Sequence, residues 1–295
     1  MSEKPPRHQS VLLREAARLL VSDPKGLYLD ATLGLGGHAQ AILDALRPEG
    51  RLLGLDLDPA SLRLAEERLR GRANFEAARA NFRDAARELK GRGFLPLSGA
   101  LYDLGVSSLH FETAERGFSL RLDGPLDMRL SPDNPLTAAT IVNRWPEEQL
   151  ALLLKDYGEE PQARRIARAI AERRAQKPFE TTLELARLLE GLLPRGKTHQ
   201  ATRTFQALRI AVNSELENLS QGLEAIVPLL RPGGRLVVIS FHSLEDRIVK
   251  TLFSSLTREG SCRFVEDRGP LKPSPEELER NPRARSAKLR AVEKQ

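Results

Sequence analysis

The sequence has 295 residues, of which 40% are hydrophobic and 29% are charged, a composition typical of globular proteins. Its length predicts about two domains. Cys262 is the only cysteine, which excludes an intramolecular disulfide and a metal site built from several thiolates. The N-terminal residues lack the apolar core of a signal peptide, and no apolar run approaches the roughly 18 residues of a membrane span. We therefore expect a soluble, cytoplasmic protein.

The net charge of +6 is unevenly distributed along the chain. Residues 161–213 contain 11 Lys and Arg against 4 Asp and Glu, and residues 280–295 contain 6 against 1. The remainder of the chain is acidic on balance. Two basic segments on such a body are typical of phosphate binding. The alternative is a solvated helix face and a disordered tail, and charge alone does not separate the two interpretations.

Strand and helix signals alternate over the first part of the chain. Short apolar runs predict strands at residues 27–29, 51–55, 74–76 and 97–101. Apolar residues at helical spacing predict helices at 11–20, 39–46, 59–69 and 82–90, and Asp58 is a capping residue before the third of them. Repeated β-α-β units of this kind predict a parallel sheet with helices on both faces.

The pattern changes after residue 109. Residues 116–135 are rich in Gly, Pro, Asp and Ser and predict a long loop. Helices without intervening strands are then predicted at 146–156, 162–175, 182–192 and 202–219. A helix at 221–230, a turn at 231–234 and an apolar strand at 235–240 resume the first pattern. We therefore predict an α/β domain, residues 1–110 and 214–295, interrupted by an all-helical insert, residues 111–213.

The first candidate site motif is a glycine turn that runs from Asp30 to Ala39. Such a turn lets the backbone pack closely against a cofactor. Gly34, Gly36 and Ala39 fit the relaxed dinucleotide fingerprint, so the glycines alone do not distinguish NAD from S-adenosylmethionine. Asp30 favours S-adenosylmethionine, because a carboxylate at this place suits an ammonium and a sulfonium better than a pyrophosphate. A purely structural turn is the alternative.

Two further candidates follow the second and third predicted strands. Asp56 lies about 20 residues past the glycine turn, where an acidic side chain can accept hydrogen bonds from ribose hydroxyls. Asp58 precedes Pro59 and is better explained as a helix cap. Phe82 follows the third strand and can pack against adenine, although on its own it is better explained as a core residue.

The fourth predicted strand leads into the segment from Asp103 to His110. Ligands of open α/β sheets lie at the carboxyl ends of the strands, so this segment is a further part of the candidate site. A plain turn in which Ser107 caps a helix is the alternative.

Seven sequence blocks together resemble one known family, the bacterial 16S rRNA cytosine-N4 methyltransferases, also called ribosomal small-subunit methyltransferase H. In this sequence the blocks are Asp30–His38, Asp103–Ser108, Glu115–Ser119, Gly124–Arg129, Ala201–Ile210, Ser240–Arg247 and Asn281–Ser286. They occur in the family's order, and the similarity starts at His8, so it covers essentially the whole chain. The middle and late blocks are far more specific than the glycine turn.

The resemblance implies a Rossmann-like S-adenosylmethionine-dependent methyltransferase fold whose helical insert recognises RNA. It implies S-adenosyl-L-methionine as the cofactor and a cytosine of 16S rRNA, in the decoding centre of the small ribosomal subunit, as the acceptor. The cofactor contacts that it implies are Gly36, Gly37, His38, Asp56, Phe82, Asp103 and His110. The family often has Pro-Gln after the Ser-Ser pair, where this chain has Leu109-His110.

Asp103 is the candidate catalytic residue for this reaction. The N4 amine of cytosine is a poor nucleophile, and a hydrogen-bond acceptor beside it would orient it and help to remove its proton. Many amino-methyltransferases carry Asn/Asp-Pro-Pro-aromatic after the fourth strand, but this chain has Asp103-Leu-Gly-Val there. The analogy therefore leaves the acceptor and the base-stacking group unassigned, and Asp103 is the only ionisable residue between Tyr102 and His110.

The remaining candidates have ordinary structural explanations. His242 could face the substrate but is better explained as a packed or surface residue, and the residues from Ser243 to Asp246 fit a capping box. Trp145 and Tyr157 could stack on a flipped base, although their helical spacing favours core positions. The histidines, at positions 8, 38, 110, 199 and 242, lack paired ligand spacing, so we predict no catalytic metal.

Two other functions fit part of the sequence. An NAD-dependent dehydrogenase would share the glycine turn and Asp56, but the chain lacks a convincing His/Asp or Tyr/Lys pair for hydride transfer. A non-catalytic RNA-binding or assembly factor would explain the basic segments and leave the acidic strand ends without a role.

Overall fold

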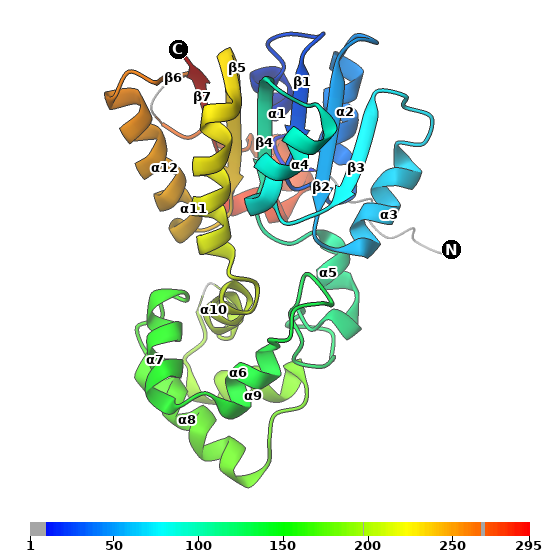
Figure 1. The fold of residues 1–295 in the computed structure, drawn as a ribbon. Coiled ribbons are helices and arrows are strands. Elements are labelled where there is room, and N and C mark those ends of the chain that lie inside the picture. The colour runs from blue at the N-terminus through cyan, green and yellow to red at the C-terminus, as the bar shows by residue number, and fades with distance from the viewer. Residues whose placement is uncertain (1–9, 197, 267–268) are drawn as a thin grey trace. The chain divides into compact units, whose positions relative to one another are not determined.

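The computed structural model describes residues 10–196, 198–266 and 269–295. The chain splits into two compact units, which are described separately here and drawn together in Figure 1. Unit 1 comprises Met1–Gly105 and Leu216–Gln295, and unit 2 comprises Val106–Glu215. His110, which we grouped with the α/β part of the chain, therefore belongs to unit 2. The start of the family resemblance at His8 lies outside the described residues.

Unit 1 contains a seven-stranded sheet with the order β3-β2-β1-β4-β5-β7-β6. Its strands are β1 Leu27–Asp30, β2 Arg51–Asp56, β3 Phe75–Arg79, β4 Leu97–Asp103, β5 Leu230–Ser240, β6 Cys262–Phe264 and β7 Lys288–Lys294. Strands β1 to β5 pair in parallel, and β7 is antiparallel to both β5 and β6. This topology confirms the predicted Rossmann-like α/β fold.

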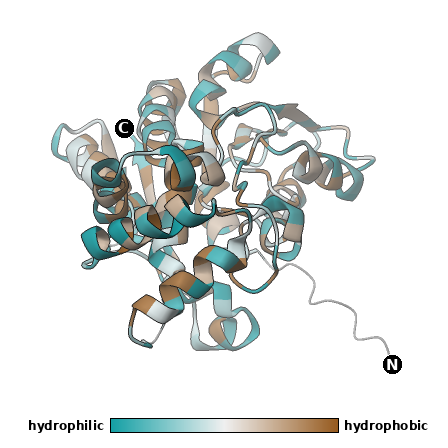
Figure 2. Ribbon diagram, turned by 90° about the horizontal axis from the view of Figure 1, so that it is seen from below, coloured by the Kyte–Doolittle hydropathy of each residue, from teal (hydrophilic) through white to brown (hydrophobic). Residues whose placement is uncertain are grey.

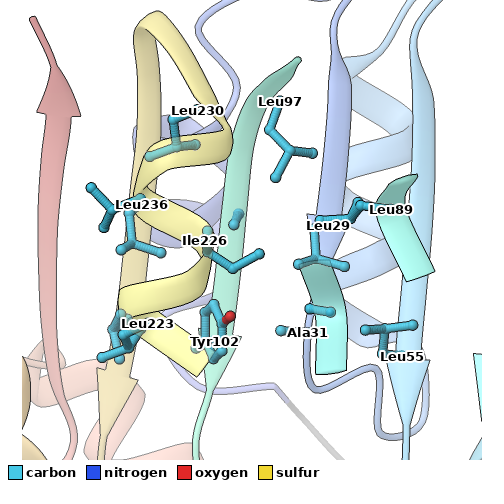
Figure 3. Close-up of a cluster of buried hydrophobic side chains, with 14 of the residues drawn as sticks. Leu29, Ala31, Leu55, Leu89, Leu97, Tyr102, Leu223, Ile226, Leu230 and Leu236 are labelled. Atoms are coloured by element: carbon cyan, nitrogen blue, oxygen red, sulfur yellow. The ribbon is translucent and has the colours of Figure 1, made fainter. Parts of the chain in front are cut away.

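Helices cover both faces of this sheet, as Figure 1 shows. They are α1 Leu13–Leu20, α2 Gly37–Ala45, α3 Pro59–Arg68, α4 Ala85–Arg92, α11 Glu215–Ile226, α12 Ser243–Arg258 and α13 Pro275–Arg280. Neighbouring residues of a strand point to opposite faces. In β1, Tyr28 packs into the core beneath α1 and α2, whereas Leu29 packs into the core with Tyr102 and Ile226 (Figure 3). Burial on both faces explains why the central strands are almost continuously apolar.

The strand order places a switch point between β1 and β4. From β1 the chain continues to β2 and β3 on one side, and then returns to place β4 and β5 on the other side. In open sheets of this kind, ligands bind at the carboxyl ends of the two strands where the order reverses. Asp30 ends β1 and Asp103 ends β4, so the fold brings two of the predicted site residues to this point.

The C-terminal basic segment is partly built into the sheet. Residues 288–294 form β7 between β5 and β6, so a disordered tail is wrong for this part of the segment. Arg290 is only 8% exposed and donates hydrogen bonds from Nε and Nη2 to the carboxylate of Asp246, at 2.7 and 3.4 Å. A guanidinium held in this way joins β7 to α12 and is not an open phosphate site.

The predicted helix at 202–219 is wrong at its C-terminal end. Helix α10, Thr202–Asn213, stops before Ser214, whose φ of +48° breaks the helix, and α11 starts at Glu215. The side chain of Asn213 receives a hydrogen bond from Leu130 N–H at 2.8 Å and donates one to the carbonyl of Met128 at 2.8 Å. These bonds to a distant loop hold the end of α10, and a local pattern of apolar residues does not reveal them.

The predicted turn at 231–234 is also wrong in part. Leu230 already pairs with Leu97 of β4, so these residues lie inside β5. The register of the two strands shifts between Leu97 and Gly99, and Gly233 has a φ of +76°. The glycine therefore supports an irregularity within a strand, which a Pro-Gly-Gly sequence does not distinguish from a turn.

Unit 2 is helical, as predicted, and has its own core. Its helices are α5 Ser108–Glu112, α6 Ala138–Arg144, α7 Glu147–Asp156, α8 Ala163–Gln176, α9 Thr182–Leu192 and α10. Each longer helix carries apolar residues on one side and polar residues on the other (Figure 2). Trp145 and Tyr157 pack half-buried against this core, in agreement with their predicted structural roles. Among the described residues, no helix is long and apolar enough to cross a membrane.

Candidate active site

The glycine turn joins the end of β1 to the start of α2. Gly34 and Gly36 have φ angles of +51° and +75°, in the left-handed region that favours glycine. A Cβ atom on Gly36 would lie 3.3 Å from Cβ of Ala65 in α3. The turn is therefore tight because of both its backbone angles and its close approach to a neighbouring helix.

Asp56 connects the end of β2 to this turn. Its Oδ2 accepts a hydrogen bond from Gly34 N–H at 2.7 Å, and its Oδ1 accepts one from Asp58 N–H at 2.8 Å. Asp58 caps α3 as predicted, because its Oδ1 accepts from Ala60 N–H at 3.2 Å and its Oδ2 accepts from the Ser61 hydroxyl at 3.1 Å. Asp56 thus shapes the glycine turn, a role that its spacing in the sequence did not indicate.

Three ionisable side chains meet at the switch point. His38, on the first turn of α2, has its Nδ1 3.4 Å from Oδ2 of Asp103 and its Nε2 3.0 Å from the carbonyl oxygen of Val11. Asp30 is fully buried, and its Oδ1 accepts a hydrogen bond from Thr32 N–H at 3.3 Å. The Asp103 N–H donates to Thr32 Oγ1 at 2.7 Å, which ties the ends of β1 and β4 together.

We call Asp30, His38 and Asp103 the switch-point cluster. Sequence motifs had selected its members one by one, but the approach of His38 to Asp103 and the bridging role of Thr32 were missed. The position of Thr32 two residues after Asp30, inside the same motif, is the signal that was available. Both ring nitrogens of His38 face protein atoms, so a cofactor contact from this residue has to come from its other atoms.

Burial and charge shift the pKa values within the cluster in one direction. Burial raises the pKa of Asp30 from 3.8 to about 7, although His38 and the Thr32 N–H oppose this shift. Burial by itself lowers the pKa of His38, but the charge and hydrogen bonding of Asp103, with the charge of Asp30, outweigh it and raise that pKa. The cluster therefore retains protons to a higher pH than isolated side chains would.

Two carboxylate oxygens of the cluster are poised to receive a ligand. Asp30 Oδ2 and Asp103 Oδ1 are buried and have no hydrogen-bond partner among the residues that the structure describes. Buried polar atoms are normally paired, because leaving them unpaired costs free energy. Two acidic oxygens in this condition would be satisfied by a cationic or hydrogen-bond-donating group, and they would repel a pyrophosphate.

Phe82 packs against Tyr102 of β4, the residue before Asp103. It begins a short 3-10 helix after β3, and its ring meets that of Tyr102 edge to face, with 5.6 Å between centroids. A Cβ on Gly222 would lie 3.0 Å from the Phe82 ring, so α11 also closes over it. The ring is half-buried, which agrees with the core interpretation and leaves one part of it accessible.

His110 lies in α5 of unit 2 and is 3% exposed. Its Nδ1 is 2.9 Å from Ser107 Oγ, and its ring packs edge to face on Phe118, with 5.1 Å between centroids. Ser107 does precede α5, but its hydroxyl makes no hydrogen bond to the helix backbone. The proposed capping role of Ser107 is therefore wrong in its chemistry, because the hydroxyl pairs with the imidazole instead.

The capping box after β5 begins one residue earlier than predicted. His242 is the cap of α12, with its Nδ1 accepting a hydrogen bond from Glu245 N–H at 3.4 Å. Glu245 Oε2 accepts in return from the N–H groups of Phe241 and His242, at 2.7 and 3.2 Å. Asp246 instead accepts hydrogen bonds from Lys288 and Arg290. An imidazole replaces the usual hydroxyl, and His242 has a structural role, as we favoured.

The fold and this site define a Rossmann-like protein with an acidic ligand site at the switch point of its sheet. The chain belongs to the MraW methylase family, whose model matches residues 6–295, and the family resemblance is thereby confirmed. Two relatives, both named ribosomal RNA small subunit methyltransferase H, are 48% identical to it. The one from Trichlorobacter lovleyi aligns over 97% of this chain and 98% of its own length, and the one from Thermomicrobium roseum over 97% and 93%.

Among solved structures, an rRNA methylase from Streptococcus thermophilus is similar to this chain at 13% sequence identity and a TM-score of 0.45. The alignment covers 100% of this chain and 99% of that one.

Proposed function

We propose that the chain transfers a methyl group from S-adenosyl-L-methionine to the N4 amine of a cytosine in 16S rRNA of the small ribosomal subunit. The observation that carries this proposal is the switch-point cluster, in which two buried carboxylate oxygens have no hydrogen-bond partner within residues 10–196, 198–266 and 269–295. The family adds support, since relatives that match nearly the full chain are named for methylation of small-subunit ribosomal RNA.

The residues present fit S-adenosylmethionine better than NAD. The cofactor carries an ammonium and a sulfonium, which would satisfy Asp30 Oδ2 and lie favourably near the Asp103 carboxylate, whereas the pyrophosphate of NAD would be repelled by both side chains. The tight turn at Gly36 and Gly37 allows close approach of a ligand to backbone. Asp56 would contact the ribose and Phe82 the adenine. The family resemblance adds His110 to the residues that we propose for cofactor binding.

Bound S-adenosylmethionine supplies an electrophilic methyl group on a positively charged sulfur. The chain has to hold the cytosine amine in line with that group, and positioning alone can be worth about 7–11 kcal/mol. We assign Asp103 Oδ1 as the acceptor that orients the amine and takes its proton as the new N–C bond forms. The carboxylate is well placed for this role because its backbone is fixed on Thr32 and its other oxygen faces His38.

The reaction is tested directly by incubating small-subunit particles or their RNA with methyl-labelled cofactor and analysing the nucleosides by mass spectrometry. Labelled N4-methylcytidine is the expected product. A label on a different nucleoside, or none with either substrate, would contradict the proposal. Calorimetry with S-adenosylmethionine and with NAD tests the cofactor separately, and preferential binding of NAD would overturn that assignment.

The role of Asp103 is tested by its replacement with alanine. We expect turnover to fall by about 10²–10⁴ at saturating cofactor, the range for a lost general base. A residue that serves only cofactor binding would raise the KM and leave turnover at saturation unchanged. Asp44→Asn, on the exposed surface of α2, is the control and should leave both constants unchanged.

For RNA binding we propose the basic face of α8 in unit 2. Arg164, Arg165 and Arg168 are all exposed there. Their present contacts are weak ones at the surface, since Arg165 Nη1 meets Gln162 Oε1 at 2.9 Å and Arg168 Nε meets Glu172 Oε1 at 2.8 Å. Such side chains can exchange these partners for phosphates.

Not every basic residue of this segment belongs to the proposed surface. Arg174, on the same helix, donates to the carbonyl oxygens of Val142 and Trp145, each at 2.7 Å. Its guanidinium joins α8 to the end of α6 and is committed to the structure of unit 2. The net charge of residues 161–213 therefore overstates what is available for RNA.

Replacing Arg164, Arg165 and Arg168 with glutamate should weaken RNA binding and flatten its salt dependence. Each lost phosphate contact reduces the log-log slope by about 0.7 for single-stranded RNA, so three contacts correspond to about 2 units. The control is the same charge change at three exposed cations of unit 1, Arg63, Arg70 and Lys90. An equal effect in both triple variants would show that net charge, and not the α8 face, determines binding.

A further inference from the structure

The imidazole of His38 faces a carbonyl oxygen and a carboxyl group. The carbonyl oxygen can only accept hydrogen bonds, and an ionised carboxylate likewise has no proton to donate. Nε2 is 3.0 Å from the Val11 carbonyl oxygen, and Nδ1 is 3.4 Å from Oδ2 of Asp103. The side chain is 5% exposed, so both contacts lie in the interior of the protein. The ring therefore lies between Val11, which precedes α1, and Asp103 at the end of β4.

This geometry determines where the protons of the ring lie. A carbonyl oxygen accepts but does not donate, so Nε2 must carry a hydrogen. A neutral imidazole has only one N–H, which would leave a lone pair on Nδ1 pointing at a carboxylate oxygen. Two lone pairs in contact repel each other, and burial strengthens the repulsion. A second proton on Nδ1 converts the same contact into a charge-assisted hydrogen bond.

The charges around the ring favour that second proton. Asp103 on β4 and Asp30 on β1 face His38 directly. Asp56 on β2 lies close enough to Asp30 to affect its pKa. Among the described residues, Arg68 of α3 brings a cation to the glycine turn, but its Nη1 donates to the Leu35 carbonyl at 3.0 Å, at the protein surface. Carboxylates therefore dominate the surroundings of His38.

We propose that His38 is doubly protonated in the free chain and is a positioning residue that acts through Asp103. Its Nδ1–H holds Oδ2, while the Thr32 hydroxyl holds the backbone of the same residue. The carboxyl group then cannot rotate, and Oδ1 stays directed at the ligand site. The identity of the amine that Oδ1 receives rests on the proposed function, but the protonation state of His38 does not.

The protonation state is tested by ¹⁵N NMR of the full chain without ligand. His38→Gln identifies the resonances of this residue by their loss. We expect both ring nitrogens to be protonated at neutral pH, with a titration midpoint above the ordinary value of about 6.5. In Asp103→Asn the midpoint should fall by about 1–3 units, because the opposite charge is gone. Asp44→Asn, at the exposed surface of the same helix, should leave it unchanged.

A wild-type midpoint at or below the ordinary value would overturn the proposal. So would a midpoint that is the same in wild type and in Asp103→Asn. Should Asp103→Asn fail to fold, Asp30→Asn provides the same test with a smaller expected fall, because Asp30 acts on His38 through its charge alone.

The positioning role is tested by the activity of His38→Gln. We expect turnover at saturating cofactor to fall about 10- to 100-fold, as for a lost hydrogen bond to a charged group. Wild-type turnover should decline at alkaline pH as His38 loses its proton, and this decline should be absent in the variant. An alkaline decline common to both proteins would contradict the role.

The two proposals fail in different ways. Without methyl transfer to ribosomal RNA the function is wrong, yet the NMR result stands. A neutral His38 in an active enzyme removes only the positioning role.

Discussion

The strongest prediction about stability concerns Asp30. Its carboxyl group is fully buried, and few hydrogen bonds offset the cost of removing it from water. One oxygen accepts a single hydrogen bond, from Thr32 N–H at 3.3 Å, and the other has none within the described part of the chain. Burial raises the pKa of Asp30 from 3.8 to about 7. One pKa unit corresponds to about 1.36 kcal/mol, so a shift of about three units amounts to about 4 kcal/mol of destabilisation when the group is ionised.

The sign follows from the protons bound in each state. Between about pH 4 and pH 7 the folded chain retains a proton on Asp30 that the unfolded chain has released. The free energy of unfolding therefore falls as the pH rises through this window. Above the window Asp30 adds no further pH dependence, because the group is ionised in both states. Asparagine has nearly the same shape and does not titrate. The stability of Asp30→Asn relative to wild type should increase by up to about 4 kcal/mol from pH 4 to pH 8.

The assay is urea unfolding of both proteins at a series of pH values, followed by circular dichroism. Only the difference between the two curves matters, because titrating groups outside the switch-point cluster contribute equally to both. Asp44→Asn, an exposed carboxylate on α2, is the control and should give a nearly constant difference. If the Asp30→Asn difference also stays constant with pH, the group is already ionised or already neutral throughout, and our account of the site's electrostatics is wrong. The same variant should bind S-adenosylmethionine more weakly, because a cation loses its buried counter-charge.

Three further substitutions test other parts of unit 1. Gly36→Ala should lower the free energy of unfolding, measured by urea titration, by about 1–2 kcal/mol, because alanine is strained at positive φ. The control is Gly91→Ala, where a Cβ meets no atom within 4 Å, and this variant should be neutral or stabilising. Asp56→Ala should reduce cofactor affinity by one to two decades, equivalent to about 1.5–3 kcal/mol, and unchanged affinity by calorimetry would remove its ribose assignment. Asp246→Ala should destabilise the chain by about 1.5–3 kcal/mol, because the buried Arg290 loses its charge-assisted hydrogen bonds to the Asp246 carboxylate. A thermal shift no larger than that of a surface variant would contradict this.

Local sequence signals determined most of the elements of unit 1. The strand that ends at Asp30 and the helix that starts at Pro59 were found because each combines a periodic apolar pattern with turn or capping residues next to it. The cap at Asp58 was assigned correctly for the same reason, since its hydrogen bonds reach only two and three residues along the chain. Signals of this kind act over a few residues and are readable without knowledge of the fold.

Features that depend on distant contacts were missed. The break at Ser214 is held by Asn213, which also bonds to Leu130 and Met128, more than 80 residues away in the sequence. The strand β7 exists because β5 and β6 offer it two antiparallel edges. The basic sequence of residues 288–294 does not by itself predict this strand pairing. Its charge suggested a tail or a phosphate site instead.

The candidate site shows the same division. Sequence motifs by themselves selected Asp30, Asp56 and Asp103, because acidic residues at strand ends are local features, and the family resemblance added His38. Only the tertiary structure decided how they act on one another. Asp103 reaches His38 because β4 pairs with β1 although they are separated by β2 and β3 in the sequence. The pKa values follow from that pairing, since burial and neighbouring charge depend on which groups the sheet brings together and not on their order along the chain.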